Sequence, residues 1–238
     1  MFWPHEAWVL HEAIRELSPE RPITVVEIGS FLGRSTIAAA SALLARANGG
    51  TLYAIDPQDD EGFRQLRSNL NGAGVGSVVR FIRATSGEAR KQFGSEPIDL
   101  VFIDGSHEYE DVRSDLGSWL PLVRPGGIVV LNDPFWLGVA RAIRERLALG
   151  GSLRSPRFAH NTLFFTYLPN AKWGRADGWE LLRLRAGLLV GSLWILLHYL
   201  VGAAPLLPWR AKQLLQGGLS LTFRPLFSRI LPSAARWR

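Results

Sequence analysis

The chain has 238 residues, of which 47% are hydrophobic, and it carries a formal net charge of +6. This length accommodates one α/β domain of ordinary size together with a small additional segment. Because the sequence contains no cysteine, disulfide bonds, thiolate metal sites and cysteine nucleophiles are excluded. The first residues lack a basic region followed by an apolar core, so we expect no secretory signal.

Positive charge is concentrated at the C-terminal end of the chain. Residues 171–238 hold 10 of the 27 Lys and Arg residues but only 2 of the 21 Asp and Glu residues. Arginines in this segment are interleaved with long leucine runs. The pattern favours a membrane surface over nucleic acid as a partner.

Apolar periodicity predicts an alternation of helices and strands in the first 170 residues. Helical spacing and buried β-branched runs alternate as follows: helix 5–17, strand 23–28, helix 37–46, strand 51–56, helix 59–70, strands 78–82 and 98–103, helix 110–120, strand 128–131, helix 136–149 and strand 162–168. Residues 122–127 are expected to form a loop before a central strand. The alternation predicts a doubly wound α/β fold with helices on both faces of the sheet.

A glycine turn follows the first predicted strand. Gly29 and Gly33 interrupt the apolar run, and Ser35-Thr36 lead into the next helix. Such a turn exposes backbone and a helix N-terminus to a ligand at the carboxyl edge of a parallel sheet. The spacing Gly-x-x-x-Gly differs from the dinucleotide fingerprint Gly-x-Gly-x-x-Gly, so a nucleotide-dependent oxidoreductase is a less favoured alternative.

Two later strand ends also carry polar groups suited to a nucleotide-like ligand. Asp56 ends the second predicted strand, where a carboxylate can accept hydrogen bonds from a ribose diol. The alternative is that Asp56 and Pro57 only open a turn. Thr85 and Ser86 follow the third strand, where they either contact an adenine edge or cap a helix.

Hard oxygen ligands follow two strands that we expect to be neighbours, with Asp104 after one and Asn132-Asp133 after the other. Carboxylates and an amide from adjacent strand ends can hold Mg²⁺ and leave positions open for a substrate oxygen. The alternative is that each acid caps the turn after it. His107 lies in the Asp104 loop, where a neutral imidazole could take a proton from a hydroxyl. An ordinary hydrogen-bonded loop histidine is the competing interpretation.

Together these segments resemble the class I S-adenosylmethionine-dependent methyltransferases. The residues that carry the resemblance are Val25–Gly33, Ala54–Asp56, Phe102–His107, Pro125–Gly127 and Leu131–Asp133. They are most similar to the small metal-dependent O-methyltransferases related to macrocin and catechol O-methyltransferases. The resemblance covers about residues 22–168 and implies a mostly parallel, Rossmann-like sheet of about seven strands.

The resemblance also implies an activity and roles for single residues. Residues 1–170 would form a domain that moves a methyl group from S-adenosylmethionine to a hydroxyl of a small or lipid-linked acceptor, a sugar included. The implied cofactor contacts are Glu27, Gly29, Ser30 and Gly33 around the methionine part, Asp56 at the ribose, Ser86 beside the adenine, and Asp104. The implied Mg²⁺ ligands are Asp104, Asn132 and Asp133, and the implied base is His107.

One departure from the family pattern concerns the metal. Related enzymes often have an acid at the position of Asn132, and the loss of one negative charge would weaken metal binding. This departure favours the alternative of a non-catalytic, membrane-tethered binding module that keeps the fold. The intact Asp104 and His107 favour an enzyme.

The tail, residues 171–238, is predicted to be helical and apolar. Residues 186–204 carry no formal charge and are long enough to span a bilayer, so 186–207 is a candidate membrane segment. A second apolar stretch, 214–231, is interrupted by arginines that could reach lipid phosphates. We therefore expect a cytoplasmic protein at the inner face of a membrane. The alternative is that these helices pack on the domain or on a second copy, which leaves a homo-oligomer open.

Overall fold

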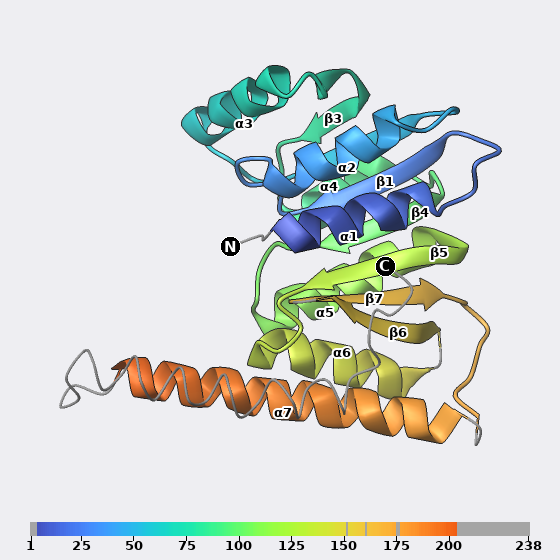
Figure 1. Ribbon diagram of the computed structural model, residues 1–238, viewed down its shortest axis with the longest axis vertical. Coiled ribbons are helices and arrows are strands. Elements are labelled where there is room, and N and C mark those ends of the chain that lie inside the picture. The colour runs from blue at the N-terminus through green and yellow to red at the C-terminus, as the bar shows by residue number, and fades with distance from the viewer. Residues whose placement is uncertain (1–3, 151, 160, 175–176, 204–238) are drawn as a thin grey trace.

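The computed structural model describes residues 4–150, 152–159, 161–174 and 177–203. Seven strands form one sheet in the order β3-β2-β1-β4-β5-β7-β6 (Figure 1). Their bounds are β1 Ile23–Ile28, β2 Gly50–Ile55, β3 Val79–Ile82, β4 Ile98–Ile103, β5 Val123–Asn132, β6 Leu153–Ala159 and β7 Thr162–Tyr167. The first five strands are parallel, whereas β7 is antiparallel to both β5 and β6.

Helices cover both faces of this sheet. They are α1 Pro4–Arg15, α2 Arg34–Leu44, α3 Asp60–Gly72, α4 Ser86–Phe93, α5 Tyr109–Trp119, α6 Leu137–Leu149 and α7 Gly178–Ala203, with short 3₁₀ turns at Gly76–Val78 and Leu120–Leu122. Buried residues of α1, α2 and α3 share one apolar cluster, and those of α4, α5, α6 and α7 share the other. The predicted doubly wound α/β fold is therefore confirmed.

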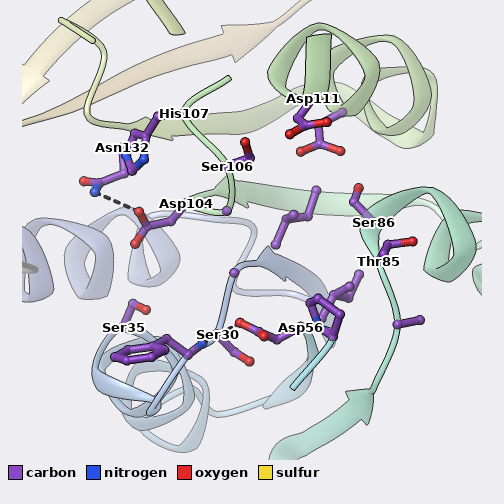
Figure 2. Close-up of a pocket in the computed structure, with 18 of the residues that line it drawn as sticks. Ser30, Ser35, Asp56, Thr85, Ser86, Asp104, Ser106, His107, Asp111 and Asn132 are labelled. Atoms are coloured by element: carbon purple, nitrogen blue, oxygen red, sulfur yellow. Dashed lines mark hydrogen bonds between the residues drawn. The ribbon is translucent and has the colours of Figure 1, made fainter. Parts of the chain in front are cut away.

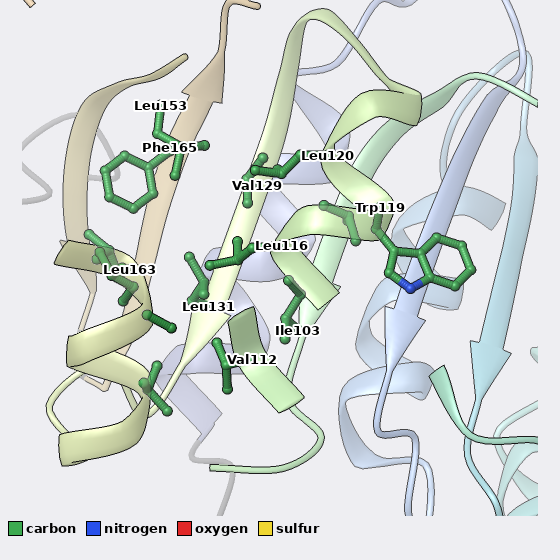
Figure 3. Close-up of a cluster of buried hydrophobic side chains, with 14 of the residues drawn as sticks. Ile103, Val112, Leu116, Trp119, Leu120, Val129, Leu131, Leu153, Leu163 and Phe165 are labelled. Carbon is green, nitrogen blue, oxygen red and sulfur yellow. The ribbon is translucent and has the colours of Figure 1, made fainter. Parts of the chain in front are cut away.

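The two cores follow from the two-residue period of the buried strands. In β4, Leu100 and Phe102 belong to the cluster with α1, whereas Val101 and Ile103 belong to the cluster with α5. Figure 3 shows the second cluster, in which side chains of α5 lie against β4 and β5. Trp119, at the end of α5, is the largest fully buried side chain among the described residues and belongs to this core.

Two strand boundaries differ from those predicted. Residues 123–127 were expected to lie in a loop because they include Pro125, Gly126 and Gly127, but they form the first half of β5. The second unexpected element is β6, which contains Pro156. Proline is tolerated there because β6 is an edge strand with a register shift between Arg154 and Arg157.

The helix α7 packs along the domain next to α6 (Figure 1). Leu184 and Leu188 are fully buried in the core that α6 helps to form. Gly191 lies against Phe135, since a Cβ at this glycine would come within 2.2 Å of the Phe135 ring. Among the residues that the structure describes, no helix combines the length and the hydropathy needed to cross a membrane. The remainder of the predicted segment 186–207, and all of 214–231, lie outside the described residues.

Candidate active site

A cavity of about 1010 Å³ opens at the carboxyl ends of β1, β2, β4 and β5. Figure 2 shows its polar side chains, which come from the loops after these strands and from α4 and α5. In an open parallel sheet this is the edge where ligands bind, on either side of the point at which the strand order reverses. Here that point lies between β1 and β4.

The glycine turn after β1 forms one wall of the cavity. Gly29 has a φ of +91°, and a Cβ there would lie 2.3 Å from the backbone oxygen of Asp104. Only glycine therefore allows the ends of β1 and β4 to approach this closely. Gly29 and Ser30 line the cavity, and their contact with the methionine part of the cofactor stays a prediction. Gly33 lies behind the wall as the left-handed cap of α2, so it shapes the turn without being a lining residue.

Asp56 supports this turn from the neighbouring strand end. Its Oδ2 accepts a hydrogen bond from the backbone N–H of Phe31 at 2.8 Å, and its carboxylate lines the cavity. The geometry therefore adds a role in holding the glycine turn to the predicted role at the ribose.

Glu27 lies behind the cavity wall and is not one of the lining residues. The side chain is 1% exposed, and its Oε2 accepts a hydrogen bond from the Thr36 hydroxyl at 2.6 Å. Burial raises the pKa of Glu27 to about 7. The predicted contact of Glu27 with the methionine part of the cofactor stays a prediction.

At the other end of the cavity, Thr85 and Ser86 begin α4. Thr85 caps the helix in a capping box with Glu88, which confirms the helix-cap interpretation for this residue. Ser86 lines the cavity, and its hydroxyl accepts a hydrogen bond from Trp119 Nε1 at 2.8 Å. Its placement beside an adenine stays a prediction.

Asp115 is a cavity residue that we did not predict. It is 6% exposed and hydrogen-bonded to Ser86, and burial raises its pKa to about 6. Asp115 shares the inward face of α5 with Val112, Leu116 and Trp119. An acid on an otherwise apolar helix face was the sequence signal that could have identified it, because carboxylates are seldom buried without a partner.

The loops after β4 and β5 meet at the far end of the cavity. His107 Nε2 and Asp133 Oδ2 are 2.8 Å apart. The carboxylate raises the pKa of His107, mainly through this hydrogen bond and against the opposing effect of burial. Asp133 has a φ of +50°, and its other carboxylate oxygen accepts a hydrogen bond from Asn161. A constrained carboxylate thus orients the imidazole.

The amide of Asn132 is oriented by its neighbours. Thr162 donates its hydroxyl to Asn132 Oδ1 at 3.3 Å, and Asn132 Nδ2 donates to Asp104 Oδ1 at 2.8 Å (Figure 2). Nδ2 also lies 3.3 Å from Asp133 Oδ2. Asn132 therefore acts as a donor between two carboxylates, and its role as a metal ligand stays a prediction.

Two of the predicted metal ligands, Asp104 and Asp133, lie close to His107. One potential ligand atom each from Asp104, His107 and Asp133 lies within 4.8 Å of the other two. His107, predicted as the base, is therefore also a member of the candidate metal group. Asn161 and Thr162, which support this end of the cavity, were not predicted because they lie just before and at the start of β7, which is distant in sequence.

Comparison with known proteins agrees with this fold. Residues 26–134 match a family model described as a methyltransferase domain. The flavonoid 3',5'-methyltransferase of Vitis vinifera is 31% identical over 129 residues, which cover 51% of this chain and 52% of that protein. The mycinamicin VI 2''-O-methyltransferase of Micromonospora griseorubida is 28% identical over 113 residues, covering 44% and 25%. The matched part thus spans about half or less of each of these relatives.

Among solved structures, the O-methyltransferase TomG from Streptomyces achromogenes, in complex with S-adenosylmethionine, is similar in fold. The TM-score is 0.54 at 22% sequence identity, covering 68% of this chain and 79% of that one. The strand order and the match to the methyltransferase family model agree with the resemblance that the sequence motifs predicted. This chain is therefore similar to methyltransferase domains over residues 26–134, and its relatives include O-methyltransferases.

Proposed function

We propose that this protein transfers a methyl group from S-adenosylmethionine to a hydroxyl of a small or lipid-linked acceptor, with His107 as the base. One observation carries the proposal: the His107–Asp133 pair lines the same cavity as the Gly29 turn and Asp56. A cofactor seated between the turn and α4 would thereby have a proton acceptor at the end of the cavity where the acceptor hydroxyl must enter.

Residues along the cavity suit the parts of the proposed cofactor. The Gly29–Ser30 backbone is accessible to the methionine part, and the Asp56 carboxylate can accept hydrogen bonds from a ribose diol. Ser86 and Asp115 offer a hydroxyl and a carboxylate at the opposite end, where the adenine would lie. The similarity to TomG, whose structure contains S-adenosylmethionine, supports this choice of cofactor.

The reaction itself requires alignment and one proton acceptor. The acceptor oxygen attacks the sulfonium methyl group, forming the O–C bond as the S–C bond breaks and the electron pair stays on sulfur. His107 takes the hydroxyl proton, while Asp133 orients the ring and stabilises the resulting imidazolium. Holding the two reactants in line accounts for much of the acceleration expected from such a site.

A divalent cation is compatible with the same end of the cavity. Asp104 and Asp133 would hold it through carboxylate oxygens, with His107 as a further donor within reach. A divalent cation bound there would lower the pKa of an acceptor hydroxyl. Two carboxylates as ligands suit Mg²⁺, and binding through them alone leaves the His107 imidazole available as the base.

Calorimetric titration of S-adenosylmethionine into the full chain tests the cofactor, once with Mg²⁺ and once with a chelator. Saturable binding supports the proposal. Transfer of a labelled methyl group to catechols, glycosylated hydroxyl compounds and lipid-linked sugars then tests the reaction. Absence of cofactor binding in both conditions would overturn the proposal, whereas binding without transfer to any acceptor class would favour a non-catalytic module.

A further inference from the structure

One side of α7 carries a row of exposed leucines. Leu182, Leu189, Leu193, Leu196 and Leu200, here called the leucine stripe, are between 39% and 59% exposed. Their spacings of seven, four, three and four residues keep them on one side of the helix. Single exposed leucines are ordinary on protein surfaces, but a continuous apolar row marks an interaction surface.

The opposite side of the same helix is occupied by the domain. Leu184 and Leu188 are fully buried, and Gly191 contacts Phe135. Packing of α7 against the domain therefore accounts for one face of the helix and leaves the leucine stripe exposed on the other. The leucine stripe therefore lies on the side of α7 that the domain does not cover.

The side chains around the leucine stripe are those of a lipid–water interface. Trp179 and Tyr199, near the two ends of α7, are 76% and 71% exposed. Aromatic residues with one polar atom are enriched at the level of lipid headgroups. Arg183 and Arg185 are also exposed, and their long side chains can reach phosphates while their stems lie on apolar surface.

Charge distinguishes between the occupants that could cover this surface. From residue 181 to the end of α7 at Ala203, the helix carries Arg183 and Arg185 and no Asp or Glu. A second copy would bring together two segments of like charge, which is unfavourable, whereas anionic headgroups are complementary to them. The charge therefore favours a lipid surface over self-association.

We propose that the leucine stripe docks flat on an anionic lipid bilayer, with the leucines inserted below the headgroups and the arginines at the phosphates. The binding is of the interfacial kind, in which apolar burial and electrostatic attraction act together. This surface is separate from the cavity, so the proposal does not depend on methyl transfer or on cofactor binding.

Co-sedimentation of the full chain with lipid vesicles, without cofactor, tests the proposal. The vesicles are phosphatidylcholine alone and phosphatidylcholine mixed with phosphatidylglycerol. We expect binding to the anionic vesicles, weaker binding to the neutral ones, and a decrease at high salt. In the double variant Leu189→Gln and Leu193→Gln, the partition coefficient should fall by about tenfold or more, since two leucines no longer enter the apolar layer.

The matched control changes two exposed leucines outside α7. In Leu149→Gln with Leu168→Gln, residues that are 72% and 39% exposed, binding should equal that of the unchanged protein. Equal thermal melting of all three proteins would establish that the fold is unaffected. Equal binding of the α7 variant and the unchanged protein would overturn the proposal, as would equal binding to neutral and anionic vesicles.

Self-association is tested in the same samples by light scattering. A dimer that the α7 variant dissociates, together with no vesicle binding by the unchanged protein, would assign the leucine stripe to a second copy and overturn the proposal. No vesicle binding by a monomer would also overturn it, because the stripe would then lack affinity for lipid. Cofactor titration remains a separate measurement, so failure of either proposal can be recognised independently.

Discussion

His107 and Asp133 are 26 residues apart in the chain, and the Nε2 and Oδ2 atoms of their side chains are 2.8 Å apart. Because a carboxylate only accepts hydrogen bonds, Nε2 carries a proton in this pair, and in the neutral ring Nδ1 is left as the acceptor. The pair resembles the oriented imidazole of a general base, and Asp133 is in turn held by Asn161.

His107→Gln should lower kcat by about 10²–10⁴-fold because the glutamine amide cannot serve as the base. Cofactor affinity should change little, since His107 lies at the acceptor end of the cavity. Steady-state methyl transfer and calorimetry measure the two effects separately. His11→Gln, on α1 and outside the cavity, is the matched control, and an unchanged kcat in His107→Gln would remove the base from the mechanism.

Asn132→Asp should make protein stability depend strongly on a divalent cation. The substitution replaces the amide donor between Asp104 and Asp133 by a third carboxylate. In chelator the melting temperature should fall by about 2–10 °C, the shift expected for a penalty of a few kcal/mol in a chain of this size. Added Mg²⁺ should reverse most of this loss, and it should raise the melting temperature of the variant more than that of the unchanged protein.

Differential scanning fluorimetry with and without Mg²⁺ measures this response. Asn170→Asp, at an exposed position, controls for the added charge. Equal Mg²⁺ responses in the unchanged protein and Asn132→Asp would argue against a cation site at this end of the cavity.

The buried carboxyl of Glu27 should make stability fall with rising pH. Its pKa is about 7 in the folded protein, against an ordinary value of 4.5 in the unfolded chain. Between these values unfolding releases a proton, so the free energy of unfolding decreases as pH rises through this window, by at most about 3 kcal/mol. The contribution is fully present below the unfolded pKa and is lost above the folded one.

Urea unfolding between pH 5 and pH 8 tests this linkage, with Glu27→Gln as the variant that cannot titrate. The stability of Glu27→Gln should decline less over this range than that of the unchanged protein. Glu20→Gln, at an exposed position, should follow the unchanged protein. Parallel curves for Glu27→Gln and Glu20→Gln would show that Glu27 is ionised in the folded state throughout.

Asp115 should contribute to cofactor affinity in a pH-dependent way. Burial raises its pKa to about 6, so the carboxylate that can accept a hydrogen bond from the cofactor forms between pH 5 and pH 7. Affinity for S-adenosylmethionine should therefore rise over this range. In Asp115→Asn the rise should be absent, and affinity at neutral pH should be about tenfold lower because a hydrogen bond to a charged group is lost.

Calorimetry at several pH values measures this effect. Glu110→Gln, an exposed position of the same helix outside the cavity, should retain the affinity and its pH dependence. If Asp115→Asn binds S-adenosylmethionine like the unchanged protein, Asp115 is only a structural partner of Ser86.

The alternation of elements and the identity of the site loops could be predicted because their signals are local. Buried β-branched runs, helical spacing and the Gly29 turn are visible within a few residues, and parallel strands bring Asp56, Asp104 and Asp133 to one edge. The edge strand β6 was not predicted, because Pro156 and two arginines interrupt the alternation of apolar and polar residues that indicates a strand. This strand forms by pairing with β7, and a pattern within a few residues of sequence does not indicate such pairing.

The fold class, the position of the cavity and eight of the residues that line it could thus be predicted from the sequence. The donor role of Asn132 emerges only in the folded chain, since its amide is oriented by Thr162 across the antiparallel β5–β7 pair. Tertiary contacts likewise bury Asp115 beside Ser86 and leave the leucine stripe of α7 facing outward. The physical reason is that periodicity specifies which residues share a face, whereas hydrogen-bond partners and exposure depend on segments that meet only in the folded chain.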